Sequence, residues 1–220
     1  MSNTLLLRLD APLQSWSILV RGRSQLTQPW PSKSGVIGMV ANALGRGYED
    51  PIEDLASLKM GVRIDQPGTI LKDYGVATNI MRADSSSIKP SEPYEKSYLS
   101  GSIFLAGLEG DESLLQNILT SLHKPARPLF LGRKSCPPAS PIWLKDGFVG
   151  KDLVSALKGY PWIGRGTHPT ELMLIFEGTK GERVNDVPIT FSRTQRRYGA
   201  RFIQYDSVEP IIEDETEEQV

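Results

Sequence analysis

The chain has 220 residues and carries 25 Lys and Arg against 26 Asp and Glu, a formal net charge of −1. This length suits one domain with an elaboration or two small domains. A single cysteine, Cys136, excludes internal disulfides and a zinc site built from several cysteines. The chain has no signal-like start and no apolar run long enough to span a membrane, so we expect a cytoplasmic protein without membrane contact.

The negative charge is concentrated at the C-terminus. Residues 209–220 hold six of the 26 acids and no base, so residues 1–208 hold all 25 bases against 20 acids, a net charge of +5. An acidic run of this kind predicts a disordered, solubilising tail. The body that remains is mildly basic, which favours an anionic partner.

The first predicted elements follow one another as strand, helix, strand, strand, helix, strand. Their expected ranges are 4–9, 34–44, 59–65, 102–108, a helix capped by Asp111, and 128–131. This βαββαβ order is that of the ferredoxin-like split βαβ, an α+β fold shared by many RNA-recognition (RRM-like) domains. Residues 69–101 contain apolar residues too scattered for a core element, which indicates an insertion that projects from the sheet.

We therefore assign residues 1–131 to a ferredoxin-like domain with an inserted thumb and residues 132–208 to a small, basic, β-rich C-terminal extension. The extension is expected to hold a short helix near 152–157 and strands near 171–177, 188–191 and 201–205.

The stretch WPSKSGVIGMVANALG, residues 30–45, places Lys33 and Ser34 at the start of the first helix. A nucleotide-binding P-loop needs glycines ahead of its Lys-Ser pair, and here Gly35 and Gly38 follow the lysine instead. Two interpretations remain open: an ordinary capped helix with a solvated lysine, or a helix N-terminus that holds a nucleic-acid phosphate.

Catalytic and metal-binding patterns are weak in this sequence. Only two histidines are present, His123 and His168, and neither stands at a metal-ligand spacing. His168, in a glycine-rich loop, fits either a loop residue or a base for RNA cleavage. We expect no metal, no cofactor and no catalysis.

Two basic stretches are more informative. FLGRKSCPP, residues 130–138, places Arg133, Lys134 and Ser135 in a tight turn where several donors can converge on one phosphate. FSRTQRRYGARF, residues 191–202, interleaves four arginines with aromatic residues that can stack on bases. Gly199 suggests a hairpin tip near residues 195–199.

Several motifs together resemble one family. They are LRLDAPLQSW at 7–16, PSKSGVIG at 31–38, LKDY at 71–74, KSYL at 96–99 and LGRKSCP at 131–137. The resemblance is to the fifth family of CRISPR-associated proteins, whose type I-E members are the CasD subunits of the Cascade surveillance complex. It runs from the first strand to about Phe202 and leaves out the acidic tail.

The resemblance implies a non-catalytic subunit that holds the 5′ handle of CRISPR RNA while its thumb hooks the adjacent backbone subunit and caps the filament. Implied partners are the RNA, the backbone, large and other Cascade subunits, and target DNA indirectly. A metal-independent endoribonuclease acting on CRISPR repeats is the alternative. Gly75 stands where some relatives are expected to have histidine, which removes one polar contact to the handle.

The residues and the resemblance together give a set of expected RNA contacts: Gln14, Trp16, Lys33, Ser34, Lys72, Tyr74, Lys96, Arg133, Lys134, Ser135, Arg193, Arg196, Arg197 and Arg201. A second set of thumb residues is expected to contact a protein partner: Ile80, Met81, Ile88, Tyr94 and Tyr98.

Overall fold

The computed structural model describes residues 2–17, 20–21, 24–82, 84 and 87–212. Its helices are α1 (Lys33–Ala43), α2 (Glu53–Ala56), α3 (Glu112–His123) and α4 (Leu153–Gly159). Its strands are β1 (Asn3–Asp10), β2 (Leu13–Gln14), β3 (Val20–Arg21), β4 (Ser24–Gln25), β5 (Lys59–Gln66), β6 (Thr69–Met81), β7 (Ile88–Ser100), β8 (Ile103–Gly110), β9 (Trp143–Val149), β10 (Leu172–Gly178), β11 (Glu182–Thr190) and β12 (Arg197–Val208).

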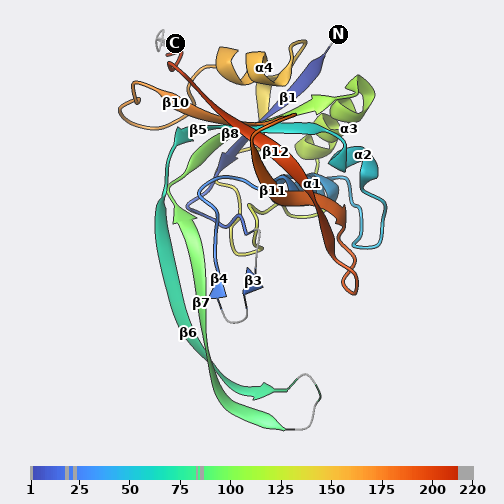
Figure 1. The fold of residues 1–220 in the computed structure, drawn as a ribbon, viewed down its shortest axis with the longest axis vertical. Helices are drawn as coiled ribbons and strands as arrows, with labels where there is room; N and C mark the ends of the chain where they lie inside the picture. Colours follow the sequence, from blue (N-terminus) through green and yellow to red (C-terminus); the bar gives the residue numbers. More distant parts are fainter. Residues whose placement is uncertain (1, 18–19, 22–23, 83, 85–86, 213–220) are drawn as a thin grey trace.

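The described strands form a mixed α/β fold dominated by sheet (Figure 1). The main sheet has the order β11-β12-β10-β5-β8-β1-β9. Within it, β9, β1, β8 and β5 are neighbours and every pair is antiparallel.

Alternation along the central strands sorts side chains onto the two faces of this sheet. Leu5, Leu7 and Leu9 of β1 lie in one buried cluster with residues of α1 and α3, whereas Leu6 lies in a second cluster with Leu157 of α4. The sheet is therefore buried on both faces at its centre, as the uninterrupted apolar run of β1 indicates.

The fourth strand was predicted in the wrong place. Residues 128–131 are irregular, and Leu131 instead accepts a backbone hydrogen bond from Ser15 and donates one to Cys136. The strand beside β1 is β9, whose pairing with β1 shifts register between Leu5 and Leu7. An irregular pairing with Lys145, Asp146 and Gly147 inside the strand hides the apolar alternation that sequence analysis relies on.

The C-terminal strands continue the main sheet, because β10 pairs with β5 and β12 pairs with β10. The proposed division near residue 131 therefore falls within elements that share one sheet. Residues 213–220, most of the expected acidic tail, lie outside the described residues.

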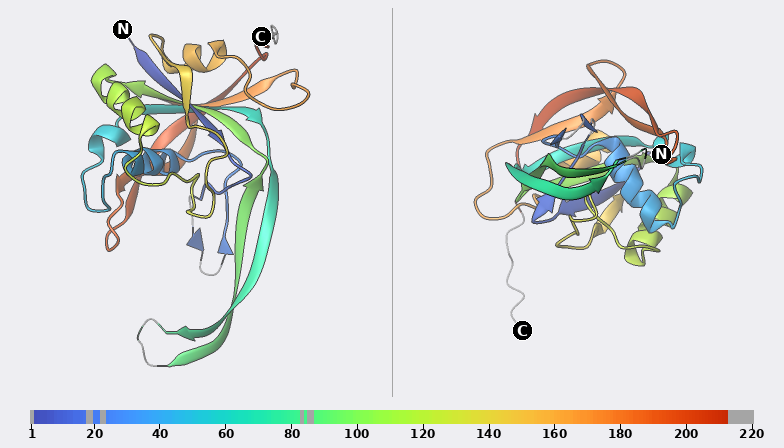
Figure 2. Two further views of the ribbon diagram at one scale, coloured as in Figure 1. Left: turned by 180° about the vertical axis from the view of Figure 1, so that it is seen from behind. Right: turned by 90° about the horizontal axis from the view of Figure 1, so that it is seen from below.

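The insertion at 69–101 is a long two-stranded hairpin. β6 and β7 pair in unbroken register from Thr69–Ser100 to Met81–Ile88. Figure 1 and Figure 2 show this hairpin, the thumb, reaching far from the body, and the β11–β12 hairpin pointing to the same side. β2 and β4 pair with β7 at the base of the thumb.

Among the described residues, no helix is long and apolar enough to cross a membrane.

Candidate nucleic-acid interface

The basic turn at residues 132–135 is held tightly against the start of the chain. Gly132 has a φ of +86°, and a Cβ atom there would lie 1.7 Å from the carbonyl oxygen of Ser15. Only glycine satisfies both conditions, since L side chains avoid positive φ and the Ser15 backbone cannot move aside as a side chain could. Gly132 thereby fixes where Arg133 and Lys134 emerge.

Arg133 joins this turn to the base of the thumb. Its guanidinium donates to the carbonyl oxygens of Ser97 (3.3 Å) and Gln25 (2.9 Å) and lies 4.8 Å from the ring centroid of Tyr98. These partners are all neutral, and no carboxylate of the described residues forms an ion pair with Arg133. Its positive charge is therefore fixed in place but not neutralised, which is the condition for attracting a phosphate.

Other expected contacts lie in the same turn and at the base of the thumb. Lys134 and Ser135 are exposed in the turn. Lys96 of β7 lies on the face of the thumb that carries Tyr98, whereas Lys72 and Tyr74 of β6 lie on the opposite face. Tyr74 has 70 % of its surface exposed. We call these six residues the thumb-base cluster: Lys72, Tyr74, Lys96, Arg133, Lys134 and Ser135.

The charges on the two thumb strands are partly paired. Lys72 lies 3.6 Å from Glu95, and Lys96 lies 4.7 Å from the ring centroid of Tyr94. Gly75 is the cross-strand partner of Tyr94, and a Cβ atom at Gly75 would lie 2.4 Å from that phenol ring. The glycine thus makes room for Tyr94, which in turn positions Lys96.

Lys33 is not a phosphate contact in this structure, which corrects that expectation. Its side chain is 2 % exposed, and its ammonium lies 2.9 Å from the carboxylate of Glu177 on β10. Burial lowers the pKa of Lys33, and Glu177 counters this effect. The Ser32 hydroxyl caps α1 by accepting a hydrogen bond from the backbone N–H of Gly35. The backbone N–H of Lys33 donates to the carboxylate of Asp186 on β11 (2.8 Å). The anion at this helix N-terminus is thus supplied by the protein itself.

Arg201 was also expected to contact RNA, and it too is buried. Only 8 % of its surface is exposed, and its guanidinium donates through Nε and Nη2 to the two carboxylate oxygens of Asp186. Asp186 falls within a register shift of the β11–β12 pair. We call Lys33, Glu177, Asp186 and Arg201 the buried charge network.

Gln14 and Trp16 are structural residues rather than RNA contacts, which corrects two further expectations. Both are fully buried, and the Gln14 amide donates to the carbonyls of Leu9 and Ser102 while accepting from the Trp16 indole. Trp16 packs against Gly35 of α1, where a Cβ atom would come within 2.9 Å of the ring. Ser34 is half-buried beside Ser32.

β11 and β12 form the predicted hairpin, but its position was predicted wrongly. The turn lies at residues 193–195 rather than 195–199, and Gly199 is paired with Val187 inside β12. Arg193 lies over the ring of Tyr48 at 4.6 Å, and its backbone N–H donates to Glu49. Arg196 and Arg197 are exposed. This tip, residues 193–197, therefore presents arginines to solvent while Arg193 ties it to the loop after α1.

Of the thumb residues expected to contact a protein partner, Tyr98 is buried, which corrects that expectation. It is 8 % exposed and belongs to the main core at the base of the thumb, so it is not available to a partner. Met81 and Ile88 face each other near the far end of the thumb and are well exposed, while Ile80 and Tyr94 are half-buried.

The sheet face that RNA-recognition domains of this topology use for base stacking is covered here. Leu153 and Leu157 of α4 pack on it, and the buried Arg63 donates to the carbonyl oxygens of Leu157 (2.7 Å) and Pro161 (2.6 Å) at the end of that helix. Arg63 is itself paired with buried Asp65. An anionic strand cannot reach the part of this face formed by β1, β5, β8 and β10 without displacing α4. β12 continues the same face of the sheet beyond the helix.

The two histidines do not form a site with each other. His123 stacks on Trp143 at a centroid distance of 4.1 Å, and His168 is exposed in the loop after α4. Both figures place α3 and the loop before β10 at opposite sides of the body. The described residues contain no group of three or more His, Cys, Asp or Glu arranged to hold a metal ion.

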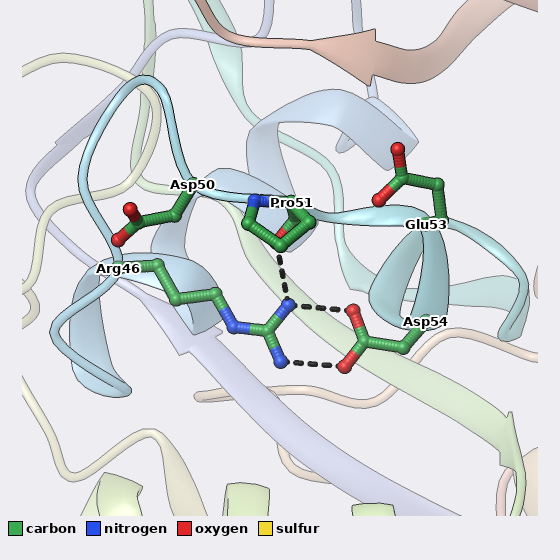
Figure 3. Close-up of a pocket in the computed structure, with 5 residues that line it drawn as sticks. All are labelled: Arg46, Asp50, Pro51, Glu53 and Asp54. Atoms are coloured by element: carbon green, nitrogen blue, oxygen red, sulfur yellow. Dashed lines mark hydrogen bonds and ion pairs between the residues drawn. The ribbon is translucent and has the colours of Figure 1, made fainter.

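A pocket beside the loop between α1 and α2 is unsuited to a polyanion (Figure 3). The guanidinium of Arg46 is bound in a two-pronged ion pair by Asp54 and also donates to the carbonyl oxygen of Pro51. Asp50 and Glu53 line the same pocket. Its carboxylates outnumber its single cation, so a phosphate is repelled there.

Sequence analysis missed the carboxylates that pair with Lys33 and Arg201 inside the protein. Nothing in the local pattern marks Glu177 or Asp186, which lie in ordinary strand sequences 144 and 153 residues from Lys33. Tyr94 was considered only as a partner contact, and the structure shows it beneath Lys96.

Comparisons with known proteins cover nearly the whole fold. The model of a family described as CRISPR-associated protein (Cas_Cas5) matches residues 4–204. The CRISPR system Cascade subunit CasD of Escherichia coli (strain K12) is 27 % identical over 187 residues, which cover 78 % of this chain and 83 % of that protein.

Two solved structures are similar as well. One, described as "Crystal structure of Cas protein", is 38 % identical with a TM-score of 0.77 and covers 94 % of this chain and 95 % of that chain. The other, described as "CRISPR RNA-guided surveillance complex", is 30 % identical with a TM-score of 0.82 and covers 94 % of this chain and 90 % of that chain.

Proposed function

Since the chain belongs to the Cas5 family of CRISPR-associated proteins, we propose that it is a non-catalytic, RNA-binding subunit of a type I-E Cascade complex. In this role it holds the 5′ handle of the CRISPR RNA at the thumb-base cluster, and its thumb docks on the adjacent backbone subunit and caps the filament. The similarity to a CasD subunit and to a chain of an RNA-guided surveillance complex supports this proposal. The strand order β9-β1-β8-β5 supports a ferredoxin-like core.

One observation carries the handle-binding role: Arg133 is fixed by neutral carbonyl oxygens, with Lys134 and Ser135 exposed beside it. A guanidinium that is immobilised but not neutralised retains its attraction for phosphate and loses little entropy on binding. Lys96 lies on the same face of the thumb as Tyr98 and adds a further cation to this surface. Tyr74, on the opposite face of the thumb, offers an exposed ring for a base.

The test is equilibrium binding of a CRISPR RNA handle to the wild-type protein and to the Arg133→Ala/Lys134→Ala variant across a range of salt concentrations. Loss of two phosphate contacts to single-stranded RNA lowers the salt slope by roughly 1.4. Lys124→Ala, an exposed lysine just after α3, is the matched control. Equal slopes for the double variant and the control would remove the basic turn from the interface.

The alternative function, a metal-independent endoribonuclease, is separated by incubating the protein with labelled repeat RNA in EDTA. A non-catalytic subunit leaves the RNA intact. Site-specific cleavage that disappears in His123→Ala or His168→Ala would overturn our proposal, although the exposed positions of these residues in separate parts of the fold favour neither as a base.

The partner role of the thumb is tested by replacing residues 79–95 with a short Gly-Ser linker. The exposed Met81 and Ile88 are removed with them, and apolar side chains of this exposure are typical of a protein interface. We expect a folded monomer that fails to join the other subunits. Normal assembly of this variant would contradict the docking role.

A further inference from the structure

The C-terminal ribbon formed by β11 and β12 has an exposed face that the handle-binding proposal does not use. Both register shifts of this pair insert their extra residues in β11, so β12 alternates regularly between two faces. Arg201 and Ile203 lie on the inner face and are buried. Tyr198 and Phe202 lie on the opposite, outer face and are 40 % and 44 % exposed.

Cations accompany these rings. Arg183 is the direct cross-strand partner of Phe202, so both side chains stand on the outer face. Arg183 is exposed, and exposed Arg196 and Arg197 immediately precede Tyr198. We call Arg183, Tyr198 and Phe202, with exposed Ala200 between the rings, the outer ribbon face.

Acidic residues near this face are already engaged. Glu182 lies beside Arg183 in the sequence, but it pairs with inner-face Ile203 and accepts a hydrogen bond from Tyr205. Asp206, farther along β12, forms an ion pair with Lys158 of α4 at 2.6 Å. The outer ribbon face thus combines arginine charge with aromatic surface, which favours an anionic, ring-bearing ligand over an acidic or neutral protein surface.

The spacing of the rings indicates a polymer. Tyr198 and Phe202 are four residues apart on a regular strand, roughly 13 Å. A single aromatic ligand cannot stack on both rings at this separation, whereas two bases of one strand with a nucleotide between them can. Small Ala200 between them leaves room for the chain to pass.

We propose that the outer ribbon face is a second nucleic-acid surface, which binds a single-stranded polynucleotide by stacking bases on Tyr198 and Phe202 and contacting phosphate through Arg183. This surface is separate from the thumb-base cluster, and its chemistry is shared by RNA and by single-stranded DNA. A strand of either kind that passes the body outside the handle is a suitable occupant.

The experiment uses the complex assembled with its guide RNA, so that the handle site is already filled. Labelled oligonucleotides of about twelve nucleotides, (rU)n in one arm and (dT)n in the other, are titrated against wild type and the variant Tyr198→Ala/Phe202→Ala. Loss of two stacked bases weakens binding about tenfold or more. The arm that shows the effect identifies which nucleic acid is bound, and an effect in both arms identifies a surface that does not discriminate.

Matched variants separate stacking from general damage. Phe202→Trp preserves the stacking surface, so it restores binding relative to Phe202→Ala, and its added fluorescence is quenched on titration. Met173→Ala, an exposed apolar residue of β10, leaves binding unchanged. Arg183→Glu weakens binding and lowers the salt slope by roughly 0.7.

Unchanged affinity of Tyr198→Ala/Phe202→Ala in both arms would overturn the inference, as would equal losses in the Met173→Ala control. Failure of Tyr198→Ala/Phe202→Ala to assemble into the complex would instead mark this face as a protein interface and would also overturn the inference. Handle binding by the isolated protein is measured in parallel, so failure of the outer ribbon face and failure of the handle-binding proposal give different results.

Discussion

Lys33 and Arg133 are both candidate phosphate contacts in the sequence, and their surroundings differ completely in the fold. At the start of α1, Lys33 and Arg201 are buried against the carboxylates of Glu177 and Asp186. At the base of the thumb, Arg133 is held only by carbonyl oxygens and an aromatic ring. A basic residue can therefore bind an external anion only where the fold does not already pair its charge with a carboxylate of the protein.

The largest effect is expected when the carboxylate at the centre of the buried charge network is removed. Asp186→Ala leaves Arg201 without its two-pronged partner and the α1 N-terminus without its anion. We expect a loss of about 3–5 kcal/mol in the free energy of unfolding, because the remaining buried charge is uncompensated. Urea denaturation measures it.

Asp146→Ala is the matched control, since Asp146 is an exposed aspartate of β9. The free energy of unfolding of Asp146→Ala should stay within about 0.5 kcal/mol of the wild-type value. A similar small change for Asp186→Ala would show that the network does not hold the ribbon to α1.

The basic turn is tested through its backbone. Gly132→Ala meets both a positive φ and the Ser15 carbonyl oxygen, and we expect it to cost about 3 kcal/mol or more and to weaken handle binding by displacing Arg133. Gly166→Ala is the control, because Gly166 has a φ of +75° and open space around it. It should cost only about 1–2 kcal/mol. Thermal unfolding and RNA titration on both variants decide the matter, and equal costs would mean that the Ser15 contact is unimportant.

The tip of the β11–β12 hairpin tests whether exposed arginines, unlike buried Arg201, contribute to binding rather than to stability. Arg196→Glu/Arg197→Glu should leave thermal unfolding within a few degrees of wild type, because exposed arginines contribute little to stability. The same change should reduce RNA binding or complex assembly by about tenfold, since it reverses two charges close to the partner. Unaltered binding and assembly would exclude the tip from the interface.

The smallest effect concerns Lys33 itself. Because burial lowers its pKa below 10.5, the unfolded chain binds this proton more strongly than the folded chain does. Stability therefore rises with pH as Lys33 loses its proton, between its lowered pKa and 10.5, and the charged form is a cost at neutral pH. Lys33→Met should remove that rise and change stability at neutral pH by less than about 1.5 kcal/mol.

Urea denaturation of wild type and Lys33→Met at neutral and alkaline pH measures this difference. A wild-type protein that loses stability relative to Lys33→Met as the pH rises would show the opposite sign, and would mean that the ion pair with Glu177 outweighs the cost of burial.

The elements whose signals are local can be predicted from the sequence. The apolar run of β1, the Asp111 cap of α3, the thumb insertion and the arginine hairpin each depend on neighbouring residues, and the structure confirms them. The motifs also identified the family correctly. Periodicity, capping and turn chemistry act over a few residues, so they can be read along one chain.

Which of the expected RNA contacts remain exposed to a ligand depends on the tertiary structure. Gln14, Trp16, Lys33 and Arg201 are buried, and the carboxylates that hold Lys33 lie 144 and 153 residues away in the sequence. β9 rather than residues 128–131 completes the sheet beside β1. Burial and charge pairing depend on strands brought together by long-range sheet pairing, which no local pattern records. The thumb-base cluster keeps its charge for the same reason: the segments packed around Arg133 contribute carbonyl oxygens, whereas those packed around Lys33 contribute carboxylates.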